Sequence, residues 1–193
     1  MSKRFSSSCE RNKHPIFEQL SIYFNKSKQI LEIGSGTGQH AIFFDPQLPH
    51  STWHTSDMCE NHPSIRTWIS ESGSKNISAP IAFKIGQDEW PYAQADAVFT
   101  ANTTHIMQIE EAQLMMEMVA KHLPKGGVFC QYGPMKVNGN YTSDSNRVFD
   151  ESLKQKGFGG IRDIEQLAAW GKRLELNATI AMPANNFLLV WQK

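Results

Sequence analysis

Cysteine is scarce in this sequence, and its three cysteines lie far apart. Cys9, Cys59 and Cys130 form no C-x-x-C pair. A disulfide framework and a zinc site both need paired or closely spaced ligands, so the sequence argues against each. The histidines likewise show no spacing of a metal-ligand set. We therefore expect reduced thiols, a cytoplasmic protein and no metal site.

The sequence also lacks an excess of charge of either sign and any long hydrophobic run. Nineteen Lys and Arg residues balance nineteen Asp and Glu residues, which argues against a broad nucleic-acid-binding face. The longest clear apolar run, FLLVW at 187–191, is far shorter than the roughly 20 residues that cross a bilayer. The N-terminal MSKRFSSSC has basic residues but no apolar segment after them, unlike a secretory signal. We expect neither a nucleic-acid partner nor membrane association.

The length of 193 residues suits one domain with a sizeable core. We expect a single domain over 1–193, in which the polar segment 1–13 is partly mobile. Apolar residues at helical spacing predict a first helix from Pro15. Beyond it the pattern predicts strands at 29–33, 51–57, 80–85, 95–101, 126–132, 174–182 and 185–192, and helices at 40–44, 63–72, 110–123, 145–155 and from Asp163. The segment 133–144 is predicted as a loop.

The order of these elements predicts the fold. Strands that alternate with helices form a parallel sheet with helices on both faces. Only Pro183 and Ala184 separate the last two strands, so these strands suit an antiparallel hairpin. Five alternating strands followed by a hairpin give a seven-stranded, mostly parallel sheet. This is the strand count of the class I methyltransferase fold, a Rossmann-like α/β fold.

The stretch LEIGSGTGQH at 31–40 carries three glycines, Gly34, Gly36 and Gly38. Glycine has no Cβ and permits positive φ, so a ligand can approach the backbone after the first strand of such a sheet. Dinucleotide-binding proteins use G-x-G-x-x-G to hold a pyrophosphate, whereas the third glycine here comes one residue earlier. Glu32, just before the glycines, suits a ligand with an ammonium group. Asp57 lies about 20 residues past them, the spacing of ribose-binding acids.

These features together predict a site for S-adenosylmethionine (SAM), which has an ammonium group and a ribose but no pyrophosphate. A tight strand-to-helix turn without a ligand is the alternative for the glycines. For Asp57 alone, an ordinary loop acid or helix cap is the alternative.

Several further motifs point to one family. They are ERNKHPI (10–16), LEIGSGTGQHA (31–41), WHTSD (53–57), ANTTHI (101–106), YGP (132–134), TSDSNRVFD (142–150), IRD (161–163) and MPANNFLLV (182–190). In this order they resemble an uncharacterised family of short, single-domain, methyltransferase-like proteins of bacteria and animals. The resemblance runs from about residue 9 to the C-terminus. It implies a class I fold and a SAM site, but it supplies no substrate.

The resemblance also implies roles for individual residues. Glu32 and the backbone of the three glycines would hold the methionine part of SAM, and Asn102 would contact its methionine end. Asp57 would bind the ribose hydroxyls, with Met58 packed beside the adenine.

The sequence departs from the family pattern at the third strand, where an acid usually faces the adenine amino group. Lys84 stands at that point, so Asp88 in the following loop and backbone carbonyls are the alternatives for this contact. The ERNK stretch at 10–13 places Arg11 where it would reach a carboxylate of SAM or of a substrate. Segment 1–13 would then act as a lid, and a solvated basic stretch is the alternative.

The candidate catalytic residues follow the fourth and fifth strands. His105 is the one candidate base, and an ordinary imidazole pKa of about 6.5 predicts a rate that falls below about pH 6. Tyr132 is the second candidate. The alternatives are a histidine bonded to backbone and a packed aromatic. The ANTTH segment is not the Asn/Asp-Pro-Pro-aromatic pattern, which disfavours N-methylation of nucleobases or glutamine.

Segment 133–155 lies where this fold commonly inserts substrate-binding parts. Asn146 and Asp150 there, and Arg162 beyond it, are polar residues without a surface-only pattern. The chain has no large appended module, which favours a small-molecule acceptor.

We therefore interpret the sequence as a SAM-dependent methyltransferase for an unidentified small molecule. A non-catalytic module that binds SAM or a related nucleoside is the alternative from another class. A nicotinamide-dependent oxidoreductase is disfavoured by the glycine spacing. The sequence sets neither the acceptor atom nor the oligomeric state.

Overall fold

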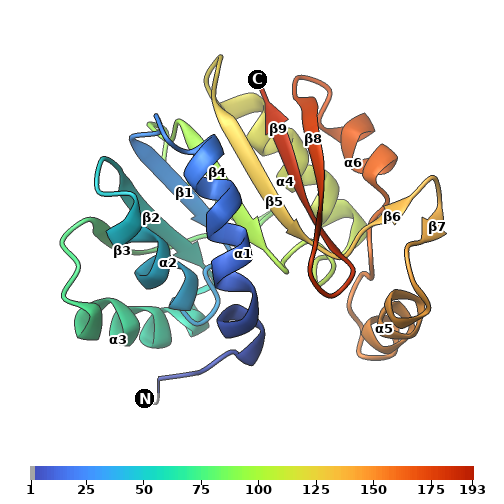
Figure 1. The fold of residues 1–193 in the computed structure, drawn as a ribbon, viewed down its shortest axis with the longest axis horizontal. Helices are drawn as coiled ribbons and strands as arrows, with labels where there is room; N and C mark the ends of the chain where they lie inside the picture. The colour runs from blue at the N-terminus through green and yellow to red at the C-terminus, as the bar shows by residue number, and fades with distance from the viewer. Residues whose placement is uncertain (1–2) are drawn as a thin grey trace. The chain divides into compact units, whose positions relative to one another are not determined.

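The computed structural model describes residues 3–193. Seven strands form one sheet in the order β3-β2-β1-β4-β5-β9-β8 (Figure 1). β1 pairs in parallel with β2 and β4, and β2 with β3, whereas β9 pairs antiparallel with both β5 and β8. The predicted fold class, a mostly parallel seven-stranded sheet with an antiparallel C-terminal hairpin and helices around it, is confirmed. The chain divides into two compact units, one ending at Thr100 and one spanning Ala101–Lys193.

The first unit has a core of aromatic rings beneath its short helices. Its elements are α1 (Ser7–Tyr23), β1 (Gln29–Ile33), α2 (Gln39–Phe44), η1 (Asp45–Gln47), β2 (Thr52–Asp57), η2 (Cys59–Asn61), α3 (His62–Ser72), β3 (Ile77–Ala82) and the start of β4 (Ala97–Ala101). Phe44, Trp53 and Phe99 are fully buried, and their ring centroids lie 5.5–5.8 Å apart. α1 packs on α2 and α2 on α3, so this core holds the turn between β1 and α2.

The first helix begins earlier than predicted. It starts at Ser7 rather than at Pro15, because the Ser6 side chain caps it by accepting the Cys9 N–H at 3.2 Å. Pro15 therefore lies inside the helix. Ile16 and Leu20, two of the apolar residues whose spacing predicts this helix, are fully buried.

The third strand is also displaced from its prediction. The expected strand at 80–85 is β3 at Ile77–Ala82, the edge strand of the sheet. An edge strand accepts Pro80, which lacks an N–H for one side of the ladder. Phe83 and Ile85 are buried beyond the end of the strand, so their apolar character reflects core packing rather than sheet pairing.

The second unit contains the closing hairpin and a small second sheet. After the last residue of β4 its elements are α4 (Ile109–His122), β5 (Val128–Gly133), β6 (Lys136–Val137), β7 (Asn140–Tyr141), α5 (Asp144–Gln155), α6 (Ile164–Trp170), β8 (Glu175–Met182) and β9 (Asn186–Gln192). The pair β6–β7 occupies the segment predicted as a loop. Ala184 and Asn185 have φ of 59° and 56°, which reverses the chain tightly between β8 and β9, as expected.

Candidate functional site

The glycine turn follows β1 as predicted. Gly34, Gly36 and Gly38 all have positive φ, at 75°, 59° and 97°. The backbone N–H groups of Gly34 and Ser35 both donate to the Ser56 carbonyl at 3.0 Å. The turn is thereby held against the end of β2, which fixes its backbone before any ligand binds.

Two of the glycines serve different purposes. A Cβ built on Gly36 meets no protein atom within 4 Å, so that side of the turn faces open space. A Cβ on Gly38 would lie 3.0 Å from the Ile65 Cα and 3.3 Å from the Trp68 Cβ. Gly38 therefore lets α2 approach α3, whereas Gly36 leaves room for a ligand beside the backbone.

Glu32 lies within β1 with its side chain buried, only 2% exposed. The Trp53 indole N–H donates to one carboxylate oxygen at 3.0 Å. Burial raises the pKa of Glu32 to about 7, and the nearby Asp57 charge adds to this effect, while hydrogen bonds from Trp53 and Ser35 oppose it. A buried carboxyl with so high a pKa is costly in its charged form and marks a functional-site candidate.

Asp57 ends β2, as the spacing predicted. One carboxylate oxygen accepts the Gly36 N–H at 2.6 Å, and the other accepts the Met58 N–H at 2.7 Å and the Asn61 amide at 2.6 Å. Burial raises its pKa, and these hydrogen bonds oppose the rise. An ionised carboxylate has about four acceptor sites, so capacity is left beyond these three bonds. The Asp57 carboxylate thereby connects the end of β2 to the turn that follows β1.

The N-terminal segment contacts the glycine turn through Arg4. Its guanidinium donates to the Asn61 side chain at 2.6 Å and lies 3.4 Å from the Gly36 carbonyl oxygen. Arg11 is exposed, with its guanidinium 3.4 Å from the Ser8 hydroxyl. Sequence reasoning missed Arg4 because no pattern in SKRFSSS distinguishes it from a solvated cation.

The ERNK and GQH motifs meet in the structure. Asn12 Oδ1 lies 2.7 Å from His40 Nε2, and both residues are buried. The His40 ring stacks on Phe44 at 5.3 Å, and burial lowers its pKa to about 4. The His40 ring is therefore neutral at pH 7, and its bond to Asn12 joins α1 to α2.

The residues assigned to adenine lie at the surface of the same unit. Met58 is 39% exposed. Asp88 is exposed and accepts the Lys84 backbone N–H at 2.7 Å, which closes the turn after β3. Its carboxylate thus stabilises the loop that departs from the family pattern.

In the second unit, three of the predicted site residues gather at the ends of β4 and β5. Asn102 has φ of 57°, a strained value for a non-glycine residue, and its N–H donates to the Tyr132 carbonyl at 2.9 Å. A Cβ on Gly133 would lie 3.7 Å from His105 Nδ1 and 3.9 Å from Asn102 Oδ1. Gly133 therefore gives these two polar side chains their space, a role that the sequence analysis did not assign.

His105 differs electrostatically from its prediction. The side chain is buried, and its ring meets Phe149 edge to face at 5.4 Å. Burial lowers its pKa to about 4, with the Arg162 charge adding to the fall and Asp150 opposing it. The expected pKa of about 6.5 is thus wrong for this environment. The ring is neutral at pH 7 and suits hydrogen-bond acceptance better than strong proton abstraction.

The polar residues of the inserted segment are held by protein groups. Asp150 is fully buried and accepts bonds from Lys154 at 2.8 Å, from Tyr141 and from the Ile161 N–H. Burial by itself raises its pKa, but these bonds outweigh burial and hold the pKa at about 2. Asn146 donates to the Asn185 carbonyl at 2.9 Å. These contacts fix α5, β7 and the loop before α6.

Two structural features are absent from residues 3–193. Within that range no group of three or more His, Cys, Asp or Glu side chains is placed to hold a metal ion. No helix in the same range combines the length and the apolar character needed to cross a membrane.

Three solved structures that are similar to this chain are named as methyltransferases. An O-methyltransferase family 2 protein from Planctomyces limnophilus, solved with apigenin, has a TM-score of 0.83 at 16% identity over 97% of this chain and 58% of its own. An O-methyltransferase family protein from Burkholderia thailandensis gives 0.79 at 14% identity over 94% and 56%. Human N-acetylserotonin methyltransferase, solved with SAM, gives 0.75 at 12% identity over 94% and 54%.

These likenesses show the fold. The chain spans little more than half the length of the three structures, and identity is low throughout. A family model matches residues 3–193, which is nearly the whole chain. The protein therefore belongs to the family described as "Protein of unknown function (DUF938)".

Proposed function

We propose that this protein binds SAM and transfers its methyl group to a small-molecule acceptor in the cytoplasm. The observation that carries the proposal is the Gly36 turn. A Cβ added at Gly36 would meet no protein atom within 4 Å, so this side of the turn is open. The adjoining strands supply two buried carboxylates, Glu32 and Asp57, whose pKa values are raised. Carboxylates that are costly to ionise in the free protein suit a ligand that brings a cationic ammonium and ribose hydroxyl donors.

We assign the residues of the first unit to the parts of SAM as follows. Glu32 and the glycine backbone would hold the methionine part, and Asp57 would accept from the ribose hydroxyls. Met58 would pack beside the adenine, whose amino group would find Asp88 or a backbone carbonyl. Arg11 was predicted to bind a carboxylate, and Arg4 is a second candidate because it already touches the turn. Separate Arg4→Ala and Arg11→Ala variants would distinguish them.

When bound, SAM supplies an electrophilic methyl group. An in-line displacement depends mainly on alignment and exclusion of water, for which effective molarities of about 10⁵ M or more are known. The polar cluster of Asn102, His105 and Tyr132 is the proposed catalytic part, with Asn102 assigned to the methionine end of the cofactor. The neutral His105 ring would accept a hydrogen bond from a hydroxyl acceptor, and Tyr132 is the alternative group for that proton.

Relatives in fold support a small-molecule acceptor. One of the similar structures holds apigenin, and another is an enzyme named for N-acetylserotonin. Both names describe compact ligands rather than macromolecules.

Binding is tested by calorimetric titration with S-adenosylhomocysteine, with NAD as the comparison ligand. We expect S-adenosylhomocysteine to bind and NAD not to bind. Catalysis is tested with methyl-labelled SAM and metabolite extracts, followed by an untargeted search for labelled products. Binding of NAD in place of S-adenosylhomocysteine would refute the proposed cofactor.

A second candidate function is a non-catalytic SAM-binding module. The low pKa of His105 favours it, because a base with a pKa of about 4 abstracts protons weakly at pH 7. Binding of S-adenosylhomocysteine without label transfer to any extract component would favour this alternative.

A further inference from the structure

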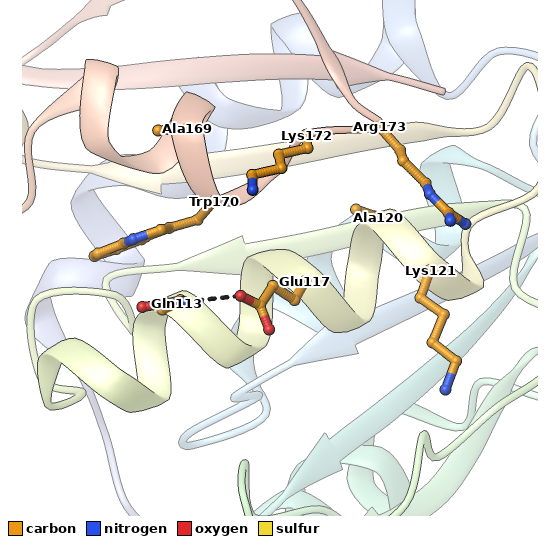
Figure 2. A pocket seen from close by; sticks show the side chains of 8 residues that line it. All are labelled: Gln113, Glu117, Ala120, Lys121, Ala169, Trp170, Lys172 and Arg173. Atoms are coloured by element: carbon orange, nitrogen blue, oxygen red, sulfur yellow. Dashed lines mark hydrogen bonds between the residues drawn. The ribbon is translucent and has the colours of Figure 1, made fainter.

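A groove on the second unit involves none of the residues assigned above. It runs between α4 and the segment that follows α6, and its volume is about 460 Å³ (Figure 2). Pockets for small organic ligands have volumes of about 300–1,000 Å³. The groove is therefore large enough for a ligand such as a mononucleotide.

One end of the groove is aromatic and polar. The indole of Trp170, the last residue of α6, runs along the groove over the Gln113 and Glu117 side chains of α4 (Figure 2). The Gln113 amide donates to one carboxylate oxygen of Glu117 at 2.8 Å. The second oxygen has no hydrogen-bond donor among residues 3–193. An indole wall beside an available carboxylate oxygen suits a flat heteroaromatic ring whose edge carries N–H donors.

The other end is cationic. Arg173 and Lys121 lie beyond the small side chain of Ala120, and Lys172 points back toward the Trp170 end (Figure 2). None of these three cations has an ion-pair partner in the described part of the chain, and Glu117 is the one acid in the lining. Unpaired cations on two sides of a groove attract a compact anion such as a phosphate.

We propose that this groove binds a purine mononucleotide of the guanine type. The ring would stack on Trp170 with its N–H edge toward Glu117, and the phosphate would lie beside the Arg173 guanidinium, near the start of the Lys121 side chain. Ala120 gives room for the sugar between the two ends. Guanine is preferred over adenine because its edge presents a ring N–H and an amino N–H side by side, which match the two oxygens of the Glu117 carboxylate; the oxygen that accepts from Gln113 keeps a second acceptor site. The inference does not depend on the proposed methyl transfer.

Calorimetric titration of the full chain with GMP tests this site. S-adenosylhomocysteine is kept in excess so that nucleotides do not report on the proposed cofactor site. We expect a Kd on the order of 10–100 µM, as is usual for ligands of this size. Guanosine alone and inorganic phosphate alone should each bind at least about tenfold more weakly, and added salt should weaken GMP binding because the phosphate contacts are exposed.

Variants identify the groove as the site. Arg173→Gln should weaken GMP binding about tenfold, the lower end of the effect of losing a hydrogen bond to a charged group. Trp170→Leu should also weaken it about tenfold, because stacking of a base on an aromatic side chain contributes a comparable amount. Glu117→Gln should remove the preference for GMP over AMP. Lys156→Gln, an exposed cation in the same unit but outside the groove, should bind GMP like the wild type.

Circular dichroism shows whether each variant is folded. Absence of wild-type binding at millimolar GMP would overturn the proposal. The proposal would also be overturned if the Trp170→Leu and Arg173→Gln variants both fold and both bind GMP with wild-type affinity. If Trp170→Leu does not fold, wild-type affinity in the folded Arg173→Gln variant is enough to overturn it. Equal affinity for GMP and inorganic phosphate would overturn the aromatic part of the site.

Discussion

Replacing Glu32 by glutamine probes the proposed cofactor site through both binding and stability. Glutamine keeps the shape of the side chain and still accepts the Trp53 indole N–H, which lies 3.0 Å from Glu32 in the wild type. It cannot supply a negative charge to a ligand ammonium group. A hydrogen bond to a charged group is worth about 1.5–3 kcal/mol, so Glu32→Gln should bind S-adenosylhomocysteine about 10- to 150-fold more weakly at pH 8.

The same carboxyl predicts a pH dependence of binding. With a pKa of about 7 in the free protein, Glu32 is mostly protonated at pH 6 and mostly ionised at pH 8. Binding of an ammonium group requires the ionised form, so wild-type affinity should fall about tenfold between pH 8 and pH 6. Glu32→Gln should lose this component.

The free energy of unfolding should depend on pH in the opposite sense to binding: binding strengthens as pH rises, whereas the folded protein becomes less stable. Because the folded-state pKa of Glu32 is raised from 4.5 to about 7, the folded protein holds a proton that the unfolded chain releases over this range. Wild-type stability therefore falls as pH rises from about 4.5 to 7, by about 3 kcal/mol for this group. Relative to wild type, Glu32→Gln should gain about that amount between pH 4.5 and pH 8.

Calorimetric titration and urea unfolding from pH 4.5 to 8 measure the two effects. Glu18→Gln, an exposed glutamate of α1 in the same unit, is the matched control and should change neither. Wild-type affinity for S-adenosylhomocysteine in the folded Glu32→Gln variant would refute the role of this carboxylate. Affinity that is constant from pH 6 to pH 8 in the wild type would refute the protonation argument.

The other site residues give further predictions. Gly36→Val should abolish S-adenosylhomocysteine binding in a folded protein, and binding by this variant would contradict the prediction. Gly38→Val should lower the melting temperature because its side chain would collide with Ile65, and an unchanged melting temperature would contradict that prediction. Asp57→Ala should weaken binding about 10- to 150-fold in titrations, and a change under twofold would place the ribose contact elsewhere. Once an acceptor is known, His105→Gln should keep cofactor affinity but lower turnover at least about tenfold. The wild-type rate should show no loss from His105 protonation between pH 8 and pH 5, since its pKa is about 4.

The sequence predicted those parts of the fold that depend on local pattern. Strand β1 and the turn of Gly34, Gly36 and Gly38 are found where glycine spacing and apolar runs placed them. Asp57 could be found because it ends a strand at a spacing set by one strand-helix-strand crossover. Such features depend on residues that are close in the sequence and on the regular geometry of the strand-helix-strand crossover.

Features set by burial were not predictable in this way. The pKa of His105 depends on Phe149 and Arg162, which are distant in sequence and reach it only in the folded unit. The Arg4 guanidinium is held by a hydrogen bond to the Asn61 side chain, which is also distant in the sequence. The bounds of β3 were predicted wrongly because Phe83 packs in the core beyond the end of the strand. Apolar character alone does not distinguish a residue within a strand from a core residue that follows it.

The bond between Asn12 and His40 bears on how much of the N-terminal region can be removed. A chain shortened through residue 12 would leave the His40 imidazole buried without its 2.7 Å partner, in an environment that already disfavours charging the ring. An unsatisfied buried polar group costs about 1–3 kcal/mol. Trimming the first helix would therefore loosen α2, the helix that begins immediately after Gly38, even though every residue of the glycine turn was kept.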